Sequence, residues 1–429
     1  MKIQPAKSIT GKIDLPGDKS ISHRAALIAA MAWGETRIEN FSTSADCAST
    51  LSCLKDLGVE IRKENSTIFI KGVGKTGFRK PEKALDCGNS GTTMRLLAGI
   101  LAGQNFESTL VGDESLSKRP MQRIIEPLEM MGAKIESENG CPPLKIHGKN
   151  PLQAICYELP VASAQVKSCV LLAGLNASGK TSVSEPSLTR DHTERMLRFF
   201  GAEIETKEGT ICISGERDLT ATDLKIPSDI SSAAFFIVAA ACLEGSDLVI
   251  KNVGLNPTRT AFIDVLRRIG AKIEFFDPRE ICNEPCANLR VFGGADLQSN
   301  SGSNVIRDKI IANLIDEIPI LAIFGTQMEN GLEIRDAGEL RVKESDRISG
   351  TVENLRRMNA KIEEFPDGFR VEKSNLKGAK IDSFGDHRIA MAFAIAALFA
   401  EGETEIEGAE CVDVSFPGFF EALAKIRND

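Results

Sequence analysis

One short phrase recurs along the chain, and this repetition constrains the fold more than any other feature of the sequence. The copies read LKDLGVEI at 54–61, LEMMGAKI at 128–135, LRFFGAEI at 197–204, LRRIGAKI at 266–273 and LRRMNAKI at 355–362, with a shorter LAKI at 423–426. Each copy predicts the end of an amphipathic helix, a Gly or Asn in the left-handed position after it, and then a β-branched strand.

A second pattern precedes each copy of the phrase. A polar cap opens an Ala- and Leu-rich helix, and a short turn and an alternating strand follow. The six openings are GDKSISHRAALIAA from Gly17, GNSGTTMRLLAGIL from Gly88, ASAQVKSCVLLAG from Ala162, SDISSAAFFIVAAA from Ser228, IDEIPILAIFG from Ile315 and GDHRIAMAFAIAALFA from Gly385. A period of roughly 70–90 residues is too long for a solenoid module and predicts a small α/β layer, so six units indicate an α/β protein with two domains of three units each.

Cations occur at these helix openings, where they oppose the helix dipole. They are Lys19, Arg24, Arg95, Lys167 and Arg388. A helix N-terminus presents unpaired N–H groups and partial positive charge, so a nearby cation is unfavourable unless an anion lies beside both. The openings therefore predict sites for a multiply charged anion. For Asp229, simple capping explains its position equally well, and for Lys167 a structural role is an equal alternative.

Two other motifs point to chemistry that their context does not support. GLNASGKT, residues 174–181, matches the P-loop pattern, but an apolar helix precedes it and a strand follows, which is the reverse of what phosphate binding needs. Cys282 and Cys286 bracket NEP without a second pair or a nearby His, so no metal site is expected.

The bulk composition narrows the function classes. A net charge of −8 argues against a general nucleic-acid binder, and no apolar run reaches the ~18 residues that a membrane helix needs. The 11 cysteines form no regular framework, and the N-terminus has no apolar signal segment. We therefore expect a cytoplasmic protein with no nucleic-acid or membrane partner.

Six motifs, taken together and in order, resemble those of the 3-phosphoshikimate 1-carboxyvinyltransferase family of enolpyruvyl transferases. They are LPGDKSISHR, GNSGTTMRLLAG, SKRPM, SAQVKS, RVKESDR and GDHRIAM, and the match runs from about residue 5 to residue 420. The resemblance implies six βαβαββ repeats in two domains, 1–18 with 229–429 and an inserted 19–228, with the active site in the cleft between them. It also implies transfer of the enolpyruvyl group of phosphoenolpyruvate to shikimate 3-phosphate, without a cofactor or metal, by a monomer that glyphosate inhibits.

The resemblance also implies roles for individual residues. Catalytic roles fall on Asp316, Glu344 and Lys19. Shikimate 3-phosphate would contact Lys19, Ser20, Arg24, Ser163, Ala164, Gln165, Arg190, Asp316 and Lys343. Phosphoenolpyruvate would contact Lys19, Asn89, Gly91, Arg119, Gln165, Arg347 and Arg388.

The stretch KESDR, residues 343–347, could be no more than a solvated helix face with weak ion pairs. With the family roles, it would place Lys343, Glu344 and Arg347 on one face of a helix and leave Asp346 as a structural partner. Two positions depart from the family pattern: Val414 replaces a common Lys, and Glu339 replaces an Asn found in some members.

Two rival functions remain open from the sequence. The related UDP-N-acetylglucosamine 1-carboxyvinyltransferases typically carry a Cys five residues before the Arg-Pro pair, where this chain has Glu114. A non-catalytic scaffold of the same fold is the other alternative, and the intact Asp316, Glu344 and three clamp arginines argue against it.

Overall fold

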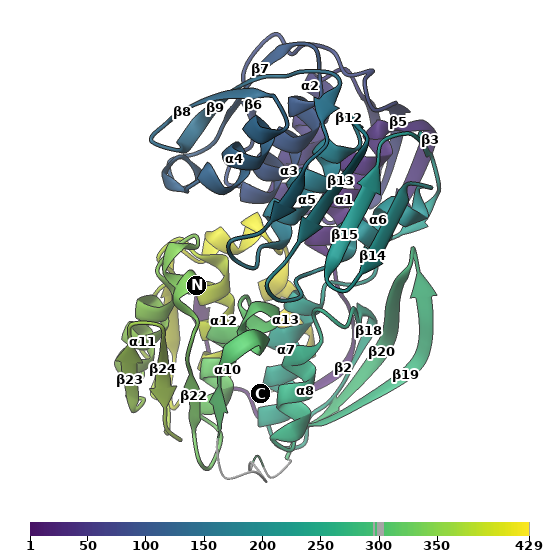
Figure 1. The fold of residues 1–429 in the computed structure, drawn as a ribbon. Coiled ribbons are helices and arrows are strands. Elements are labelled where there is room, and N and C mark those ends of the chain that lie inside the picture. The colour runs from purple at the N-terminus through teal and green to yellow at the C-terminus, as the bar shows by residue number, and fades with distance from the viewer. Residues whose placement is uncertain (295–296, 298–303, 429) are drawn as a thin grey trace. The chain divides into compact units, whose positions relative to one another are not determined.

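The computed structural model describes residues 1–294, 297 and 304–428, and the chain divides into two compact units (Figure 1). The discontinuous unit comprises Met1–Pro16, Pro227–Arg279 and Pro285–Asp429, and the inserted unit comprises Gly17–Ile226 with Glu280–Glu284. Each unit has its own apolar core. The chain passes from one unit to the other after Pro16 and after Ile226. The sequence predicted these crossovers after residues 18 and 228, two residues further along the chain in each case.

The segment Glu280–Glu284 groups with the inserted unit, whereas the sequence assigned it to the other domain. It forms the tip of the hairpin of β19 (Lys272–Ile281) and β20 (Glu284–Phe292). The buried Glu284 carboxylate lies 2.7 Å from His192 Nδ1, and Arg195 donates to the Asn283 carbonyl at 2.8 Å. These partners lie about ninety positions away in sequence. The contacts therefore could not be predicted from the local sequence pattern.

The inserted unit contains three four- or five-stranded sheets. The first consists of β3 (Ala32–Glu39), β4 (Glu60–Glu64), β5 (Thr67–Val73), β16 (Leu219–Thr220) and β17 (Leu224–Lys225). The second consists of β6 (Leu85–Asp86), β7 (Glu107–Val111), β8 (Lys134–Glu138) and β9 (Cys141–His147). The third consists of β11 (Cys156–Glu158), β13 (Lys180–Ser184), β14 (Glu203–Lys207) and β15 (Thr210–Ser214), and the short β10 (Leu152–Gln153) and β12 (Ala177–Ser178) pair separately.

The discontinuous unit also contains three sheets within the described residues. The first joins β19 and β20 to β18 (Asp247–Gly254), β2 (Ser8–Asp14) and β27 (Arg427–Asn428). The second consists of β21 (Val305–Ile306), β22 (Leu332–Ile334), β23 (Ile362–Phe365) and β24 (Gly368–Val371). The third consists of β1 (Lys2–Ile3), β25 (Lys380–Asp382) and β26 (Thr404–Glu407).

Five of the sheets that the structure describes share one strand arrangement. A first strand runs parallel to a second, and the second pairs antiparallel with the later strand of a hairpin, as in the order β6-β7-β9-β8. The same order holds for β11-β13-β15-β14 and β21-β22-β24-β23. In two sheets a distant segment supplies the first strand: β17 lies beside β3, and β2 lies beside β18.

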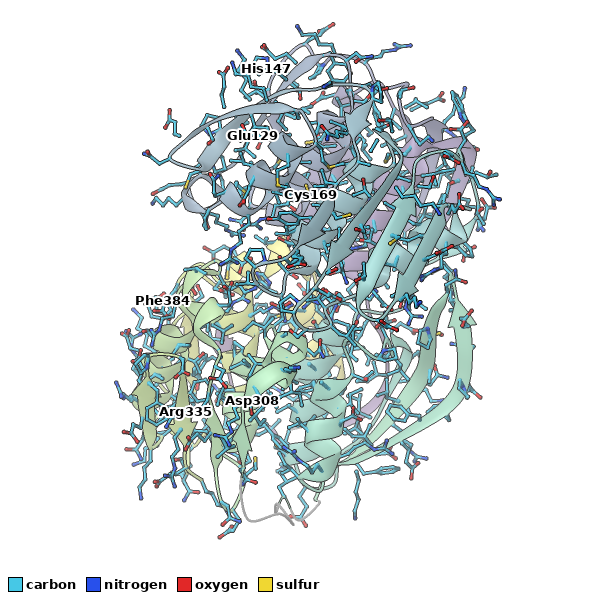
Figure 2. The ribbon with its side chains drawn as sticks, in the orientation of Figure 1. Glu129, His147, Cys169, Asp308, Arg335 and Phe384 are labelled. Carbon is cyan, nitrogen blue, oxygen red and sulfur yellow. The ribbon has the colours of Figure 1, made fainter. Side chains whose placement is uncertain are left out.

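A helix forms at each of the six openings, as the sequence predicted. These helices are α1 (Lys19–Met31), α3 (Gly91–Ala102) and α5 (Ala164–Gly174) in the inserted unit, and α7 (Ile230–Cys242), α10 (Ile318–Gly325) and α12 (His387–Phe399) in the discontinuous unit. They are almost wholly buried, as expected of helices that are apolar on all sides. Cys169 on α5, labelled in Figure 2, lies in this core.

The recurring phrases end a second set of helices, which expose one face. These are α2 (Ala45–Asp56), α4 (Gln122–Met130), α6 (His192–Phe199), α8 (Ala261–Arg268), α11 (Arg347–Arg357) and α13 (Phe419–Ile426), with the short α9 (Ile311–Leu314) before α10. The expected left-handed residue follows five of them, with positive φ at Gly58, Gly132, Gly201, Gly270 and Asn359.

Candidate functional site

The buried helices α1, α3 and α5 meet at their first turns. Asp18, Ser90 and Ser163 cap the three helices through their side chains. Arg24 of α1 donates to Ser168 of α5 at 2.9 Å, and Gln165 of α5 donates to Thr92 of α3 at 2.9 Å. The N-terminal ends of three helices therefore lie together, as an anion site requires.

Lys19 is the first residue of α1, and a carboxylate holds its side chain. Its Nζ donates to Asp46 Oδ2 at 2.9 Å, and Asp46 lies in the first turn of α2. Ser20 follows in the same turn and accepts a hydrogen bond from Arg24 through its carbonyl. Asp46 could not be identified from the sequence, because only the fold brings α2 to this point.

Arg24 is buried, and polar groups surround its guanidinium. It donates to Thr193 Oγ1 at 2.7 Å, to Ser168 Oγ and to the Ser20 carbonyl. Burial lowers the pKa of Arg24 to about 10, while Glu194 raises it and Arg190 lowers it further. Arg190 precedes α6, and its charge opposes that of the buried Arg24 guanidinium, an unfavourable interaction that a bound anion would relieve.

A second group of cations flanks Gly91 at the start of α3. Arg95 donates to Gln165 Oε1 at 2.7 Å, and Arg119 donates to Asn89 Oδ1 at 3.0 Å. A Cβ atom built on Gly91 would lie 2.7 Å from Arg95 Nη1 and 3.4 Å from Arg119 Nη1. The structure thus brings Asn89, Gly91, Arg119 and Gln165 together, and it adds Arg95, which the sequence placed at a helix opening without giving it a role.

We call the following residues the anion half-site of the inserted unit: Lys19, Ser20, Arg24, Asp46, Asn89, Gly91, Arg95, Arg119, Gln165 and Arg190. Ser163 and Ala164 stand at its edge as the cap and first residue of α5. All the inserted-unit residues that the sequence proposed therefore fall at or near the first turns of α1, α3 and α5, or just before α6.

In the discontinuous unit, Arg347 is surrounded by three carboxylates and is 2% exposed. Its Nε donates to Asp386 Oδ2 at 2.8 Å, and its Nη2 donates to Glu344 Oε2 at 2.6 Å. Its Nη1 reaches Asp316 Oδ1 at the longer distance of 3.4 Å. Burial alone would lower the pKa of Arg347, but Asp386, Glu344 and Asp316 outweigh it, and the pKa is raised.

Arg388 joins the same cluster from the first turn of α12. Its Nη1 donates to the Asp316 carbonyl at 2.8 Å, and its Nη2 lies 3.9 Å from the Asp316 carboxylate. Glu317 lies 3.7 Å from Arg388 and also accepts from Ser231 of α7. The first turns of α7, α10 and α12 are therefore tied together, and we call Asp316, Glu317, Glu344, Arg347, Asp386 and Arg388 the carboxylate–arginine cluster.

Asp386 caps α12 and is fully buried. Burial would raise the pKa of its carboxyl group, but Arg347 lowers it, and the net shift is downward. Asp386 therefore serves as the permanent counter-ion of Arg347. The sequence contained it in GDHR, where its spacing from Arg347 gave no signal of the contact.

The KESDR stretch does not lie on one helix face, which corrects the expectation from its spacing. Helix α11 begins only at Arg347, and the preceding residues form a bend. The reason is the cap: Asp346 accepts from Ile348 N and Ser349 N, and it also accepts from Arg341 at 2.7 Å. Asp346 is thus a structural partner, as predicted, and Glu344 meets Arg347 across the cap.

Val414 lies in a 3₁₀ turn, residues Ala409–Val414, and supplies no charge there. The P-loop match runs from the end of α5 at Gly174 through a turn and the short β12 into β13, so no helix follows it, as the sequence predicted. Among the described residues, no group of His, Cys, Asp or Glu is arranged to hold a metal ion. No helix there is long and apolar enough to cross a bilayer.

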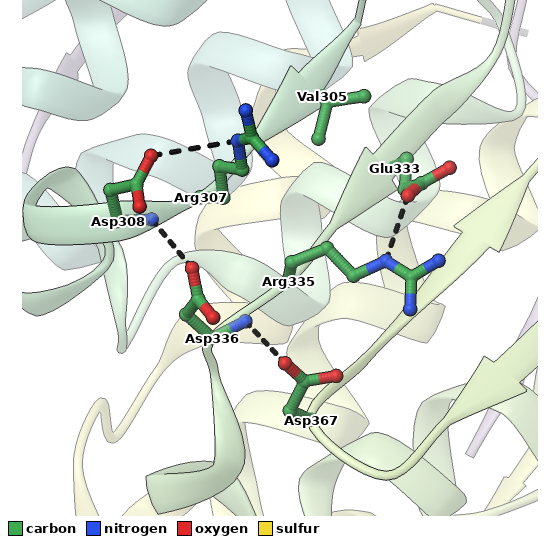
Figure 3. A pocket seen from close by; sticks show the side chains of 7 residues that line it. All are labelled: Val305, Arg307, Asp308, Glu333, Arg335, Asp336 and Asp367. Atoms are coloured by element: carbon green, nitrogen blue, oxygen red, sulfur yellow. Dashed lines mark hydrogen bonds and ion pairs between the residues drawn. The ribbon is translucent and has the colours of Figure 1, made fainter.

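A surface pocket of about 820 Å³ lies elsewhere in the discontinuous unit (Figure 3). Asp336 accepts from the Asp308 amide, and Asp367 accepts from the Asp336 amide, both at 2.9 Å, so these carboxylates fasten the loops. Arg335 pairs with Glu333 and stacks on Phe365. None of the predicted site residues lines this pocket.

Comparison with known proteins gives consistent results along the chain. The model of the EPSP synthase (3-phosphoshikimate 1-carboxyvinyltransferase) family matches residues 3–423. The chain is 53% identical to 3-phosphoshikimate 1-carboxyvinyltransferase of Solibacter usitatus and 49% identical to that of Brevibacillus brevis, with 99% of each chain covered. It superposes on a solved structure of EPSP synthase from Acinetobacter baumannii with a TM-score of 0.89 at 44% identity, covering 99% of this chain and 98% of that one.

Proposed function

The chain belongs to the EPSP synthase (3-phosphoshikimate 1-carboxyvinyltransferase) family, and from this premise we propose how its own residues carry out the reaction. The enzyme transfers the enolpyruvyl group of phosphoenolpyruvate to the 5-hydroxyl of shikimate 3-phosphate and releases phosphate, a step of the shikimate pathway. Both substrates carry several negative charges, so the site must gather cations and manage two proton transfers.

We propose six βαβαββ repeats, three in 1–18 with 229–429 and three in 19–228, with the active site in the cleft between the domains. The shared strand order of five sheets supports the repeats. The two clusters of helix N-termini support the site, because each gathers only part of the required chemistry. The anion half-site supplies cations, and the carboxylate–arginine cluster supplies the carboxylates.

Shikimate 3-phosphate would bind with its phosphate near Arg24 and Arg190, whose positive charges already act on each other. Its remaining contacts in this proposal are Lys19, Ser20, Ser163, Ala164, Gln165, Asp316 and Lys343. Phosphoenolpyruvate would bind beside Gly91, between Arg119 and the clamp of Arg347 and Arg388, with Lys19, Asn89 and Gln165 completing the contacts. Guanidinium groups suit both its phosphate and its carboxylate, because they bind such oxygens bidentately.

One contact in the cluster supports a sequence of events. Asp316 is the most weakly held of the three carboxylates on Arg347, at 3.4 Å. An incoming anion would take its place on Nη1 and leave the Asp316 carboxylate able to accept a proton. Substrate binding and activation of the base are then coupled through one guanidinium.

The chemical steps balance with two proton carriers. The 5-hydroxyl gives its proton to a carboxylate, its oxygen attacks C2 of phosphoenolpyruvate, and the methylene carbon gains a proton, which gives a tetrahedral intermediate. The new methyl group then loses a proton as the C2–O bond to phosphate breaks. Asp316 resembles the base, Glu344 the second carrier, and Lys19 stabilises the developing charge.

The observation that carries this proposal is the Asp316 carboxylate within 4 Å of two buried arginines. The test is release of phosphate from phosphoenolpyruvate that depends on shikimate 3-phosphate. Release that depends instead on UDP-N-acetylglucosamine would identify the sister activity, and no release with either acceptor would indicate a scaffold.

All 11 cysteines are free thiols, which supports a location in the reducing cytoplasm. We also propose that the protein is a monomer.

Shikimate 3-phosphate should draw the two units together. Lys19, Arg24 and Arg119 belong to one unit, and Lys343, Arg347 and Arg388 belong to the other. The dianionic ligand would bridge these cations and shift the population toward a closed form. Small-angle scattering should show a smaller radius of gyration at saturation, and an unchanged radius would contradict the bridging role.

Gly91→Ala should weaken inhibition by glyphosate more than it weakens phosphoenolpyruvate binding. The added methyl group would meet Arg95 Nη1 at 2.7 Å and force the guanidinium away from Gln165. We expect Ki for glyphosate to rise by about 10–200-fold, the usual effect of one methyl group in a tight pocket, with a smaller rise in KM. Gly338→Ala, whose Cβ meets nothing within 4 Å, is the matched control. Equal losses for inhibitor and substrate would refute the steric explanation.

A further inference from the structure

Lys167 is the least expected buried charge in the inserted unit. Its side chain is 1% exposed in the middle of α5, and its Nζ lies 3.1 Å from Glu185 and 2.8 Å from Glu194. Both carboxylates are also buried, at 2% and 3% exposed. One ammonium group thus holds two desolvated carboxylates from different segments of the chain.

The first carboxylate fastens the segment that carries Arg190. Glu185 accepts from the Thr189 amide at 3.2 Å and from the Thr189 hydroxyl at 2.5 Å. Thr189 is the residue immediately before Arg190. The position of the Arg190 backbone therefore depends on Glu185, which Lys167 holds in place.

The second carboxylate fastens the helix that holds Arg24. Glu194 is the neighbour of Thr193 in α6, and Thr193 Oγ1 accepts from Arg24 at 2.7 Å. Ser168, the neighbour of Lys167, accepts from Arg24 at 2.9 Å and lies 2.7 Å from Thr193 Oγ1. Glu194 Oε2 is buried and has no hydrogen-bond partner within the described residues, so Lys167 is its main fixed contact.

A purely structural role is a poor explanation for this cluster. Three buried charges cost desolvation, and well-packed apolar side chains of similar size stabilise a core as well or better. The advantage of buried charges here is a single defined geometry, because Lys167, Glu185 and Glu194 must each keep a charged partner.

We propose that Lys167 is a positioning residue that sets the two arginines of the shikimate 3-phosphate site, Arg190 through Glu185 and Arg24 through Glu194. The inference rests on the proposed function, because it assigns the ligand of that same site. Of the proposed phosphoenolpyruvate contacts, only Gln165 lies on α5 with Lys167, and it hydrogen-bonds to Thr92 and Arg95 of α3. Phosphoenolpyruvate binding should therefore depend less on Lys167 than shikimate 3-phosphate binding does.

The test is Lys167→Met in the full chain, with binding of shikimate 3-phosphate measured by calorimetry and both KM values measured by phosphate release. We expect Kd and KM for shikimate 3-phosphate to rise at least tenfold, while KM for phosphoenolpyruvate changes less than about threefold. A variant with a lowered Tm but normal shikimate 3-phosphate binding, or with equal losses for both substrates, would overturn the inference.

If Lys167→Met does not fold, Glu185→Gln tests the same link. It keeps the shape of the side chain and retains the Lys167–Glu194 pair, and it should still weaken the binding of shikimate 3-phosphate selectively. Unchanged binding would refute the link to Arg190. Leu144→Ala, a buried core change in β9, should lower Tm without selective loss; a selective loss there would mean that any destabilisation produces the effect. A wild-type chain that binds no shikimate 3-phosphate would refute the proposed function itself, and this inference with it.

Discussion

Replacing Glu344 with glutamine should lower kcat by about 10²–10⁴, the usual contribution of a general acid or base. Glutamine keeps the length of the side chain and can still accept from Arg347 Nη2, which now donates to Glu344 at 2.6 Å. The change therefore removes the proton transfer that we propose for Glu344 and leaves the geometry of the cluster largely intact. Steady-state kinetics with both substrates measures the effect, and the Kd for shikimate 3-phosphate should change little.

Asp346→Asn, two residues along the chain, is the matched control for Glu344→Gln. Asp346 caps α11 and pairs with Arg341, and asparagine is about as good a cap as aspartate. Activity should mostly survive, and any loss should appear as a lower stability. An active Glu344→Gln enzyme together with an inactive Asp346→Asn enzyme would show that the chemistry belongs to the other carboxylate of KESDR.

The part of the fold that depends on local sequence could be predicted. The left-handed Gly or Asn after each amphipathic helix follows from backbone sterics, and Gly58 and Asn359 both adopt it. The apolar openings likewise predicted buried helices, because an all-round apolar surface has to be covered. Each of these properties is fixed by neighbours within a few residues.

The partners of the site residues could not be predicted, because they depend on distant segments. Asp386 meets Arg347 across 39 positions, and Asp46 meets Lys19 across 27. The KESDR expectation failed for a local reason of a different kind. The spacing of Lys343, Glu344 and Arg347 was compatible with one helix face. However, Asp346 is the N-cap of α11, so the helix starts only after it and does not include Lys343 or Glu344.

Removing Arg347, the central cation of the carboxylate–arginine cluster, should cause a large loss of stability. Arg347→Met leaves Asp386 fully buried without its counter-ion, and breaking such a pair typically costs about 3–5 kcal/mol. Urea unfolding followed by circular dichroism measures this loss in the free energy of unfolding. Activity should also fall, because the proposed phosphoenolpyruvate clamp and the support of Glu344 disappear together.

The control for Arg347→Met is Arg290→Met, which removes an arginine that pairs with Asp247 on the exposed surface. That change should alter stability little, because exposed ion pairs contribute little. An Arg347→Met protein as stable as the wild type would mean that Asp386 finds another partner, contrary to the geometry of the cluster.

A second substitution separates the two roles of Arg347. In Arg347→Met combined with Asp386→Asn, no uncompensated charge remains at the buried position, so a large part of the lost stability should return. Turnover should stay low, because neither substitution restores the guanidinium that holds Glu344 and Asp316 and that we propose binds phosphoenolpyruvate. Recovery of both stability and turnover would show that Arg347 serves only the fold. Recovery of stability alone is the result expected if one buried arginine both neutralises Asp386 and binds the substrate anion.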